Sequence, residues 1–100
     1  MQKRVVVKEP NREAKIIKID TSLATLQEIV EGWIEYVYPY EANIAVICNE
    51  EGKLRGLEPN IMTERYGVLY GTIIVCERTG KDLGKKLAEE YVKILNDAEV

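Results

Sequence analysis

The chain has 100 residues, of which 46% are hydrophobic and 31% charged, a composition that excludes intrinsic disorder of the whole chain. This length suits one domain, and we expect residues 1–100 to form it. The net charge of −3, with both signs interspersed, argues against a nucleic-acid partner. Because no apolar run has the length of a signal-peptide core or a membrane span, we expect a cytoplasmic protein that contacts no membrane.

The first third of the chain predicts a hairpin followed by a short helix. Residues 5–7 and 16–19 are β-branched runs typical of two neighbouring strands. Residues 20–22 then supply helix-capping oxygens, and apolar side chains follow at helical spacing. Gly32 is expected to end this helix.

Segment 33–40 is rich in aromatic and β-branched residues and predicts a strand that ends near Pro39, which has no N–H to donate. Alternation places Trp33 and Tyr36 on opposite faces of this strand. Because both faces carry large side chains, the strand is either central or has its second face committed to a partner or a ligand.

The middle of the chain predicts a buried strand, a reversal and a long loop. Residues 43–48 are mostly apolar, and residues 49–53 form a good turn in which Gly52 is free to adopt positive φ. Over residues 54–67 neither the helical nor the strand period persists. We therefore predict a long structured loop there, a kind of segment that often carries function.

The last third predicts the central strand and a second helix. Residues 68–76 form the strongest strand of the sequence, with Gly71 marking a bulge or a close backbone approach. A helix follows residues 79–82, with Leu87 and Tyr91 on the apolar stripe that covers the sheet. The order β-β-α-β-β-loop-β-α predicts an α+β fold, an antiparallel or mixed sheet of about five strands with two helices.

Cysteine and histidine usage bears on redox chemistry and catalysis. Cys48 and Cys76 lie in apolar runs without the spacing of a zinc or redox motif, so we expect buried free thiols, with a bridge between adjacent strands as the alternative. The chain has no histidine, the commonest general base and metal ligand. We therefore expect no catalytic residue, no metal and no cofactor, and an enzyme using carboxylates or Cys48 is the least favoured interpretation.

The aromatic residues and the predicted loop suggest a ligand site. Six tyrosines and one tryptophan without a phenylalanine favour rings with polar handles, which suit interfaces and stacking pockets as well as ordinary strand packing. Because the aromatic segment and the loop can converge, we predict Tyr38, Asn60, Thr63 and Arg65 as ligand contacts. The ring would stack, the two polar side chains would form hydrogen bonds, and the guanidinium would face a phosphate.

A second, basic candidate surrounds the predicted start of the last helix. Arg78, Lys81, Lys85 and Lys86 gather there, and backbone N–H groups of the helix would add to an anion site. The alternative interpretation is a set of solvated charges with no ligand.

Several sequence runs, spread over residues 5–75, carry a resemblance to a known family. The most specific is Cys-Asn-Glu-Glu-Gly-Lys at residues 48–53, and the others include Gly-Trp-Ile-Glu at 32–35 and Pro-Asn at 59–60. These runs resemble domain-of-unknown-function family 3846, whose short members are found in Firmicutes, their phages and plasmids. The resemblance implies a mobile-element context and supplies no activity. Members usually carry arginine after the residue matching Asn60, where this chain has Ile61 and Met62, and the resemblance makes Arg65 the candidate to take its place.

Taken together, these features predict a non-enzymatic binding protein of phage or mobile-element type. It would bind or sequester a nucleotide-like small molecule, or it would bind a host protein. Both possibilities rest on analogy with other small phage proteins. The rival hypothesis is a homodimeric interaction module with no small-molecule ligand. In that hypothesis segment 33–40 forms a two-fold interface, and we expect self-association through it.

Overall fold

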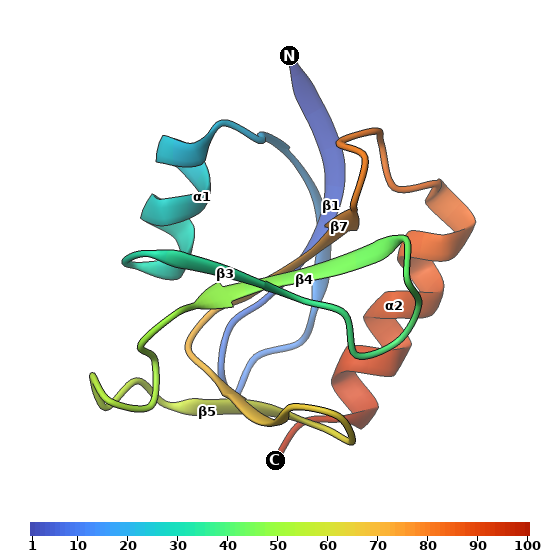
Figure 1. Cartoon of the computed structure of the whole chain (residues 1–100). Helices are drawn as coiled ribbons and strands as arrows, with labels where there is room; N and C mark the ends of the chain where they lie inside the picture. Colours follow the sequence, from blue (N-terminus) through green and yellow to red (C-terminus); the bar gives the residue numbers. More distant parts are fainter.

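The computed structural model describes residues 1–100 and contains seven strands and two helices (Figure 1). Five strands form one antiparallel sheet in the order β2-β1-β7-β4-β3, and β5 pairs with β6 in a separate antiparallel hairpin. The predicted α+β class is therefore confirmed. In chain order the elements are β1 (Gln2–Lys8), β2 (Lys15–Asp20), α1 (Leu23–Val30), β3 (Ile34–Val37), β4 (Ile44–Asn49), β5 (Pro59–Thr63), β6 (Gly67–Tyr70), β7 (Ile73–Glu77) and α2 (Lys85–Asp97).

The predicted hairpin and the helix after it are both present. β1 and β2 pair antiparallel, and the Oγ of Ser22 caps α1 by accepting a hydrogen bond from the Thr25 backbone N–H at 3.3 Å. The left-handed residue at the end of α1 is Glu31, with φ of 66°, rather than the glycine that follows it. The backbone N–H of Gly32 still closes the helix by donating to the Gln27 carbonyl oxygen at 3.0 Å.

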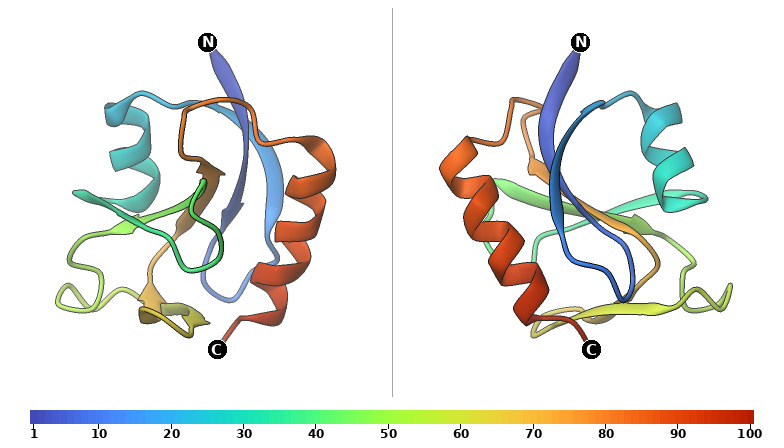
Figure 2. Two further views of the ribbon diagram at one scale, coloured as in Figure 1. Left: turned by 45° about the vertical axis from the view of Figure 1, so that its right-hand side comes forward. Right: turned by 180° about the vertical axis from the view of Figure 1, so that it is seen from behind.

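The two helices cover opposite faces of the large sheet (Figure 2). Under α2, Val6 and Val75 of the sheet pack with Tyr91, which is 1% exposed, while Leu87 is partly buried against the same cluster. The predicted apolar stripe of α2 is therefore confirmed. Leu83 is fully buried in this cluster, although it lies before the first turn of the helix.

A second core cluster lies between the sheet and α1. Leu26 and Val30 of the helix pack there with Val5, Ile47 and Ile74. Successive strand residues thus point to opposite buried faces, which explains why the central strands are continuous apolar runs rather than alternating ones.

The segment predicted as one strand over residues 68–76 is divided, and that prediction is wrong. Its first part, β6, belongs to the small hairpin, whereas β7 is the central strand of the large sheet. The division falls at Gly71, where φ is 84° and an added Cβ would lie 2.7 Å from Cδ1 of Leu57. The predicted close approach at Gly71 is therefore confirmed, and Ile73 and Ile74 of β7 are fully buried.

The predicted loop over residues 54–67 contains a strand, so this prediction also needs correction. β5 lies inside it and forms the small hairpin with β6. The C-terminal residues pair with the other edge of β5: the Met62 N–H donates to the Ala98 oxygen at 2.9 Å, and the Val100 N–H donates to the Asn60 oxygen at 3.1 Å. The hairpin is thereby held between the sheet and the end of the chain.

β3 is an edge strand, which excludes the central position that was one of two alternatives for segment 33–40. Val37 of β3 is buried under α2, whereas Trp33 just before the strand is 66% exposed and Tyr36 is 47% exposed. The outer edge of β3 and these two rings remain open.

Both cysteines are free thiols, as predicted, but only Cys48 is buried and Cys76 is half-buried. The alternative of a bridge between adjacent strands is excluded by their positions. Cys76 lies opposite Ala45 rather than opposite Cys48, and the two thiols belong to the clusters on opposite faces of the sheet. Neither helix combines the length and the apolar character needed to cross a membrane.

Candidate functional site

Asn60, one of the four predicted ligand contacts, has a structural duty that the sequence did not reveal. It is fully buried, and its Nδ2 donates to the carbonyl oxygens of Lys8 at 2.8 Å and Gly71 at 2.9 Å. Its Oδ1 accepts from the Lys8 ammonium at 2.9 Å. Because both amide hydrogens are used inside the protein, Asn60 joins β5 to β1 and to the break between β6 and β7.

Lys8 completes this buried polar cluster. Its Nζ lies 2.7 Å from Oε1 of Glu99, in the one salt bridge of the structure, and also donates to the Glu9 carbonyl oxygen at 3.3 Å. The Lys8 side chain is 0% exposed and that of Glu99 is 36% exposed. A buried ammonium requires such partners, so the cluster fastens the C-terminal residues to the fold.

Thr63 likewise shapes the backbone. Its Oγ1 donates to the Gly67 carbonyl oxygen at 2.9 Å and accepts from the Tyr66 N–H at 3.0 Å. The residue is 3% exposed. These bonds fix the turn between β5 and β6, which carries Arg65 outward.

The other two predicted contacts, Tyr38 and Arg65, do come together. They line one surface hollow of about 580 Å³, which we call the tyrosine–arginine hollow; its other lining residues are Tyr40, Glu41, Ala42, Tyr66 and Arg78. The β3–β4 connection, the β5–β6 turn and the residue after β7 each supply part of it. The Tyr38 N–H donates to the Tyr66 hydroxyl at 3.2 Å, which joins two of these segments directly.

The hollow contains two cationic side chains and one anionic side chain. Arg65 and Arg78 are exposed, and neither guanidinium has a hydrogen-bond or salt-bridge partner. The carboxylate of Glu41 accepts a hydrogen bond from the Tyr91 hydroxyl at 3.2 Å. An anion that enters the hollow would therefore meet two free guanidinium groups and one carboxylate that already has a donor.

Tyr40 forms the inner wall of the hollow. Its ring packs on that of Tyr91, with centroids 5.6 Å apart and planes inclined by 53°. The Tyr40 hydroxyl is buried and has no hydrogen-bond partner. Burial raises the pKa of Tyr40, so the hydroxyl stays protonated and is an unused donor.

The structure separates the second predicted site into two parts. Arg78 and Lys81 line another hollow, whereas Lys85 and Lys86 are exposed on the first turn of α2 and line neither this hollow nor the first. This second hollow lies over the α1 side of the sheet, and we call it the sheet-face hollow. Its lining comprises Lys3, Val5, Thr21, Leu26, Tyr36, Ile47, Ile74, Cys76, Glu77, Arg78, Gly80 and Lys81.

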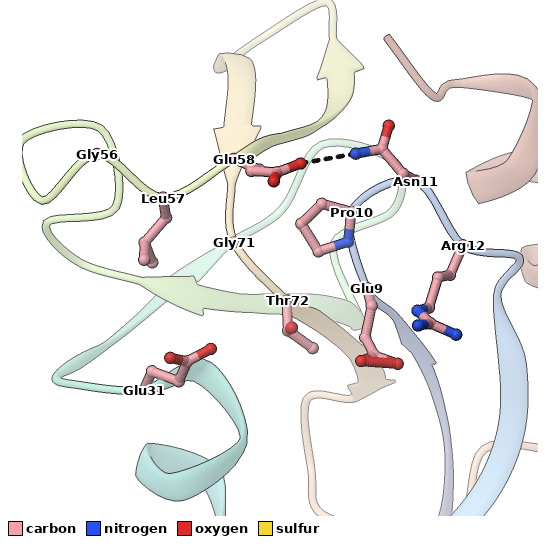
Figure 3. A pocket seen from close by; sticks show the side chains of 10 residues that line it. All are labelled: Glu9, Pro10, Asn11, Arg12, Glu31, Gly56, Leu57, Glu58, Gly71 and Thr72. Atoms are coloured by element: carbon pink, nitrogen blue, oxygen red, sulfur yellow. Dashed lines mark hydrogen bonds between the residues drawn. The ribbon is translucent and has the colours of Figure 1, made fainter.

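No sequence pattern pointed to the largest groove, whose volume is about 680 Å³ (Figure 3). It lies between the β1–β2 turn, the end of α1 and the 56–58 segment, so its residues are scattered along the chain. Figure 3 shows the carboxylates of Glu9 and Glu31 on either side of Thr72, and Glu58 accepting from Nδ2 of Asn11 at 2.6 Å. No group of three or more acidic or cysteine side chains lies close enough to hold a metal ion. The acidic lining makes this groove unsuited to an anion.

Comparison with known proteins gives one match. The family model described as "Domain of unknown function (DUF3846)" matches residues 1–96. No curated protein and no solved structure matches the chain.

Proposed function

The chain belongs to the DUF3846 family, and we propose that it is a non-enzymatic binding protein of phage or mobile-element type that takes a nucleotide-like anion in the tyrosine–arginine hollow. One observation carries this proposal. Two guanidinium groups without partners, those of Arg65 and Arg78, line the same hollow as the rings of Tyr38 and Tyr66.

The two arginines account for the anionic part of the ligand. A guanidinium offers a planar fork of donors that matches phosphate oxygens in pairs, which an ammonium cannot do. Because Arg65 and Arg78 come from different segments, they would hold two sides of one phosphate group or two successive phosphates. Since both are exposed, their attraction for the ligand should weaken as salt is added.

The tyrosines account for an aromatic part. Stacking of a base on an aromatic ring contributes about 1–3 kcal/mol to binding. Because every base can stack, this contribution does not select one base over another. Tyr38 is partly buried and Tyr66 is 42% exposed, so both have ring surface to offer. The hydrogen bond from the Tyr38 backbone N–H to the Tyr66 hydroxyl holds the Tyr66 ring beside the Tyr38 backbone before a ligand arrives.

The chemistry of the hollow supports binding rather than catalysis. The carboxylate of the hollow, that of Glu41, already accepts a hydrogen bond from a tyrosine hydroxyl, and the chain has no histidine to act as a general base. Burial raises the pKa of the Cys48 and Cys76 thiols to about 11, so neither is a ready nucleophile at neutral pH.

Calorimetry against a panel of linear and cyclic nucleotides, at low and at physiological salt, tests the proposal. Arg65→Ala and Arg78→Ala should each weaken binding by about 1.5–3 kcal/mol, the scale of a hydrogen bond to a charged group. Arg12→Ala is the matched control, because Arg12 is an exposed arginine that lines the acidic groove instead. Silence across the panel, or an equal loss with Arg12→Ala, would count against the hollow as a nucleotide site.

A homodimer without a small-molecule ligand is the second candidate, favoured by the open edge of β3. The Trp33 carbonyl oxygen accepts from the Glu50 N–H at 2.8 Å, so the backbone groups of Ile34 and Tyr36 point away from β4 toward that edge. With Trp33 66% and Tyr36 47% exposed, a second copy could pair along this edge and cover both rings.

Sedimentation over a range of concentrations tests the dimer. Trp33→Ser should lower the dimer fraction, whereas Leu54→Ser, which removes an exposed apolar side chain elsewhere, should leave it unchanged. Pairing centred on Glu35 would place two carboxylates opposite each other, so Glu35→Gln should then tighten the dimer. A monomer mass at every concentration would rule this candidate out.

A further inference from the structure

The sheet-face hollow has an apolar floor built from several elements. α1 has only eight residues and leaves part of its face of the sheet uncovered. Val5, Ile47 and Ile74 come from three neighbouring strands of the sheet, and Leu26 comes from α1; all four are at most 4% exposed. Tyr36, which is 47% exposed, forms one wall above this floor.

The rim of the same hollow is cationic. Lys3 of β1, Arg78 and Lys81 line it, and none of the three side chains has a hydrogen bond or salt bridge. The one carboxylate in the lining, Glu77, accepts from the Thr79 hydroxyl at 2.5 Å. The cations that attract an anion to the rim therefore come from β1 and from the β7–α2 connection.

Two further titratable groups in the lining are neutral near pH 7. Burial raises the pKa of the Cys76 thiol to about 11, and it also raises the pKa of the Tyr36 hydroxyl, with the neighbouring Cys76 as a smaller cause. Neither group repels an anion. Asp82, outside the lining, is near Lys3, but its Oδ1 accepts a hydrogen bond from the Arg4 backbone N–H at 2.6 Å.

We propose that the sheet-face hollow binds a small aliphatic carboxylate, with the hydrocarbon against the floor and the carboxylate among the three cations of the rim. Its volume of about 100 Å³ sets the size of the ligand. That space equals about three water molecules at liquid density, which is room for a chain of about three or four carbon atoms. The site is distinct from the tyrosine–arginine hollow except for Arg78, which lines both.

Proton–nitrogen correlation NMR with acetate and butyrate, at constant ionic strength, tests this inference. Butyrate should shift the amide signals of Tyr36 and Cys76 in a saturable way, and acetate should do so more weakly because it buries less hydrocarbon. Butanol keeps the hydrocarbon and lacks the charge, and butylamine reverses the charge. Butanol should bind more weakly than butyrate, and butylamine should leave both signals in place.

Variants of the rim give the second readout. Lys3→Ala and Lys81→Ala should each weaken butyrate binding about two- to fivefold, the scale of one exposed ion pair. Lys93→Ala, which removes an exposed lysine from α2, should have no effect. The proposal is overturned if butyrate produces no saturable shift, if butanol or butylamine binds as tightly as butyrate, or if both rim variants behave like the control.

Discussion

Replacing Asn60 by alanine is expected to be among the most damaging single changes in this protein. The substitution removes one hydrogen bond from the Lys8 ammonium and two hydrogen bonds to backbone oxygens, all of them buried. A bond to a charged group contributes about 1.5–3 kcal/mol and a neutral one about 0.5–1.5 kcal/mol, so the expected loss in unfolding free energy for the three bonds is about 2.5–6 kcal/mol. Since a domain of this size is stable by about 5–15 kcal/mol, the variant should be marginal.

Urea denaturation followed by circular dichroism measures this loss. Asn43→Ala is the matched control, because Asn43 is exposed and its side chain forms no hydrogen bond, and its effect should stay within about 0.5 kcal/mol. A loss below about 1 kcal/mol for Asn60→Ala would refute the reasoning, since no removal of a satisfied buried amide should cost so little. Such a small loss would also support the prediction from the sequence that Asn60 is a ligand contact.

Three further outcomes are expected. Tyr40→Phe should leave stability unchanged or raise it, because the hydroxyl that it removes is buried without a partner. Tyr91→Phe should lower stability by about 1.5–3 kcal/mol, because it removes a hydrogen bond to a carboxylate; thermal melts compare the two variants. Burial raises the pKa of the Cys48 and Cys76 thiols from 9.0 to about 11. The stability that these thiols contribute is therefore fully present below pH 9.0 and is lost as pH rises through 11. A variant that lacks both thiols should show a smaller loss of unfolding free energy at alkaline pH. Gly71→Ala should destabilise the fold by at least about 1 kcal/mol in urea, given the φ of 84° there, and an unchanged midpoint would contradict the strained-turn argument.

Features set by neighbouring residues could be predicted from the sequence. The cap of α1 at Ser22 depends on a bond to a residue three positions later, and the stripe of α2 repeats with the helical period, so both were predicted correctly. At the break, Gly71 has a φ of 84° and its N–H donates at 2.7 Å to the oxygen of Glu58, which is remote in sequence. No local pattern distinguishes a glycine within a strand from one that divides two strands, which is why residues 68–76 were predicted as a single strand.

The difference between local contacts and contacts remote in sequence also explains which of the predicted site residues line a hollow. The prediction that the aromatic segment and the 54–67 region converge holds for Tyr38 and Arg65, which line one hollow. Asn60 and Thr63 lie in the same region, but their polar atoms are turned to backbone groups inside the protein. Composition shows that a polar side chain is available, and only the fold shows whether its hydrogen-bonding capacity is already used.

Arg78 connects the two inferred binding sites, because it lines both the tyrosine–arginine hollow and the sheet-face hollow. Its guanidinium has no partner in the protein and carries one positive charge, so two anions that approach it from both sides would share that charge and repel each other. Occupation of one hollow should therefore weaken binding in the other, and linkage requires the effect to be equal in both directions. Removal of Arg78 should weaken both sites and reduce the antagonism, whereas removal of Arg65 should affect only the tyrosine–arginine hollow. A small carboxylate would then act as a regulator of nucleotide binding through the arginine that follows β7.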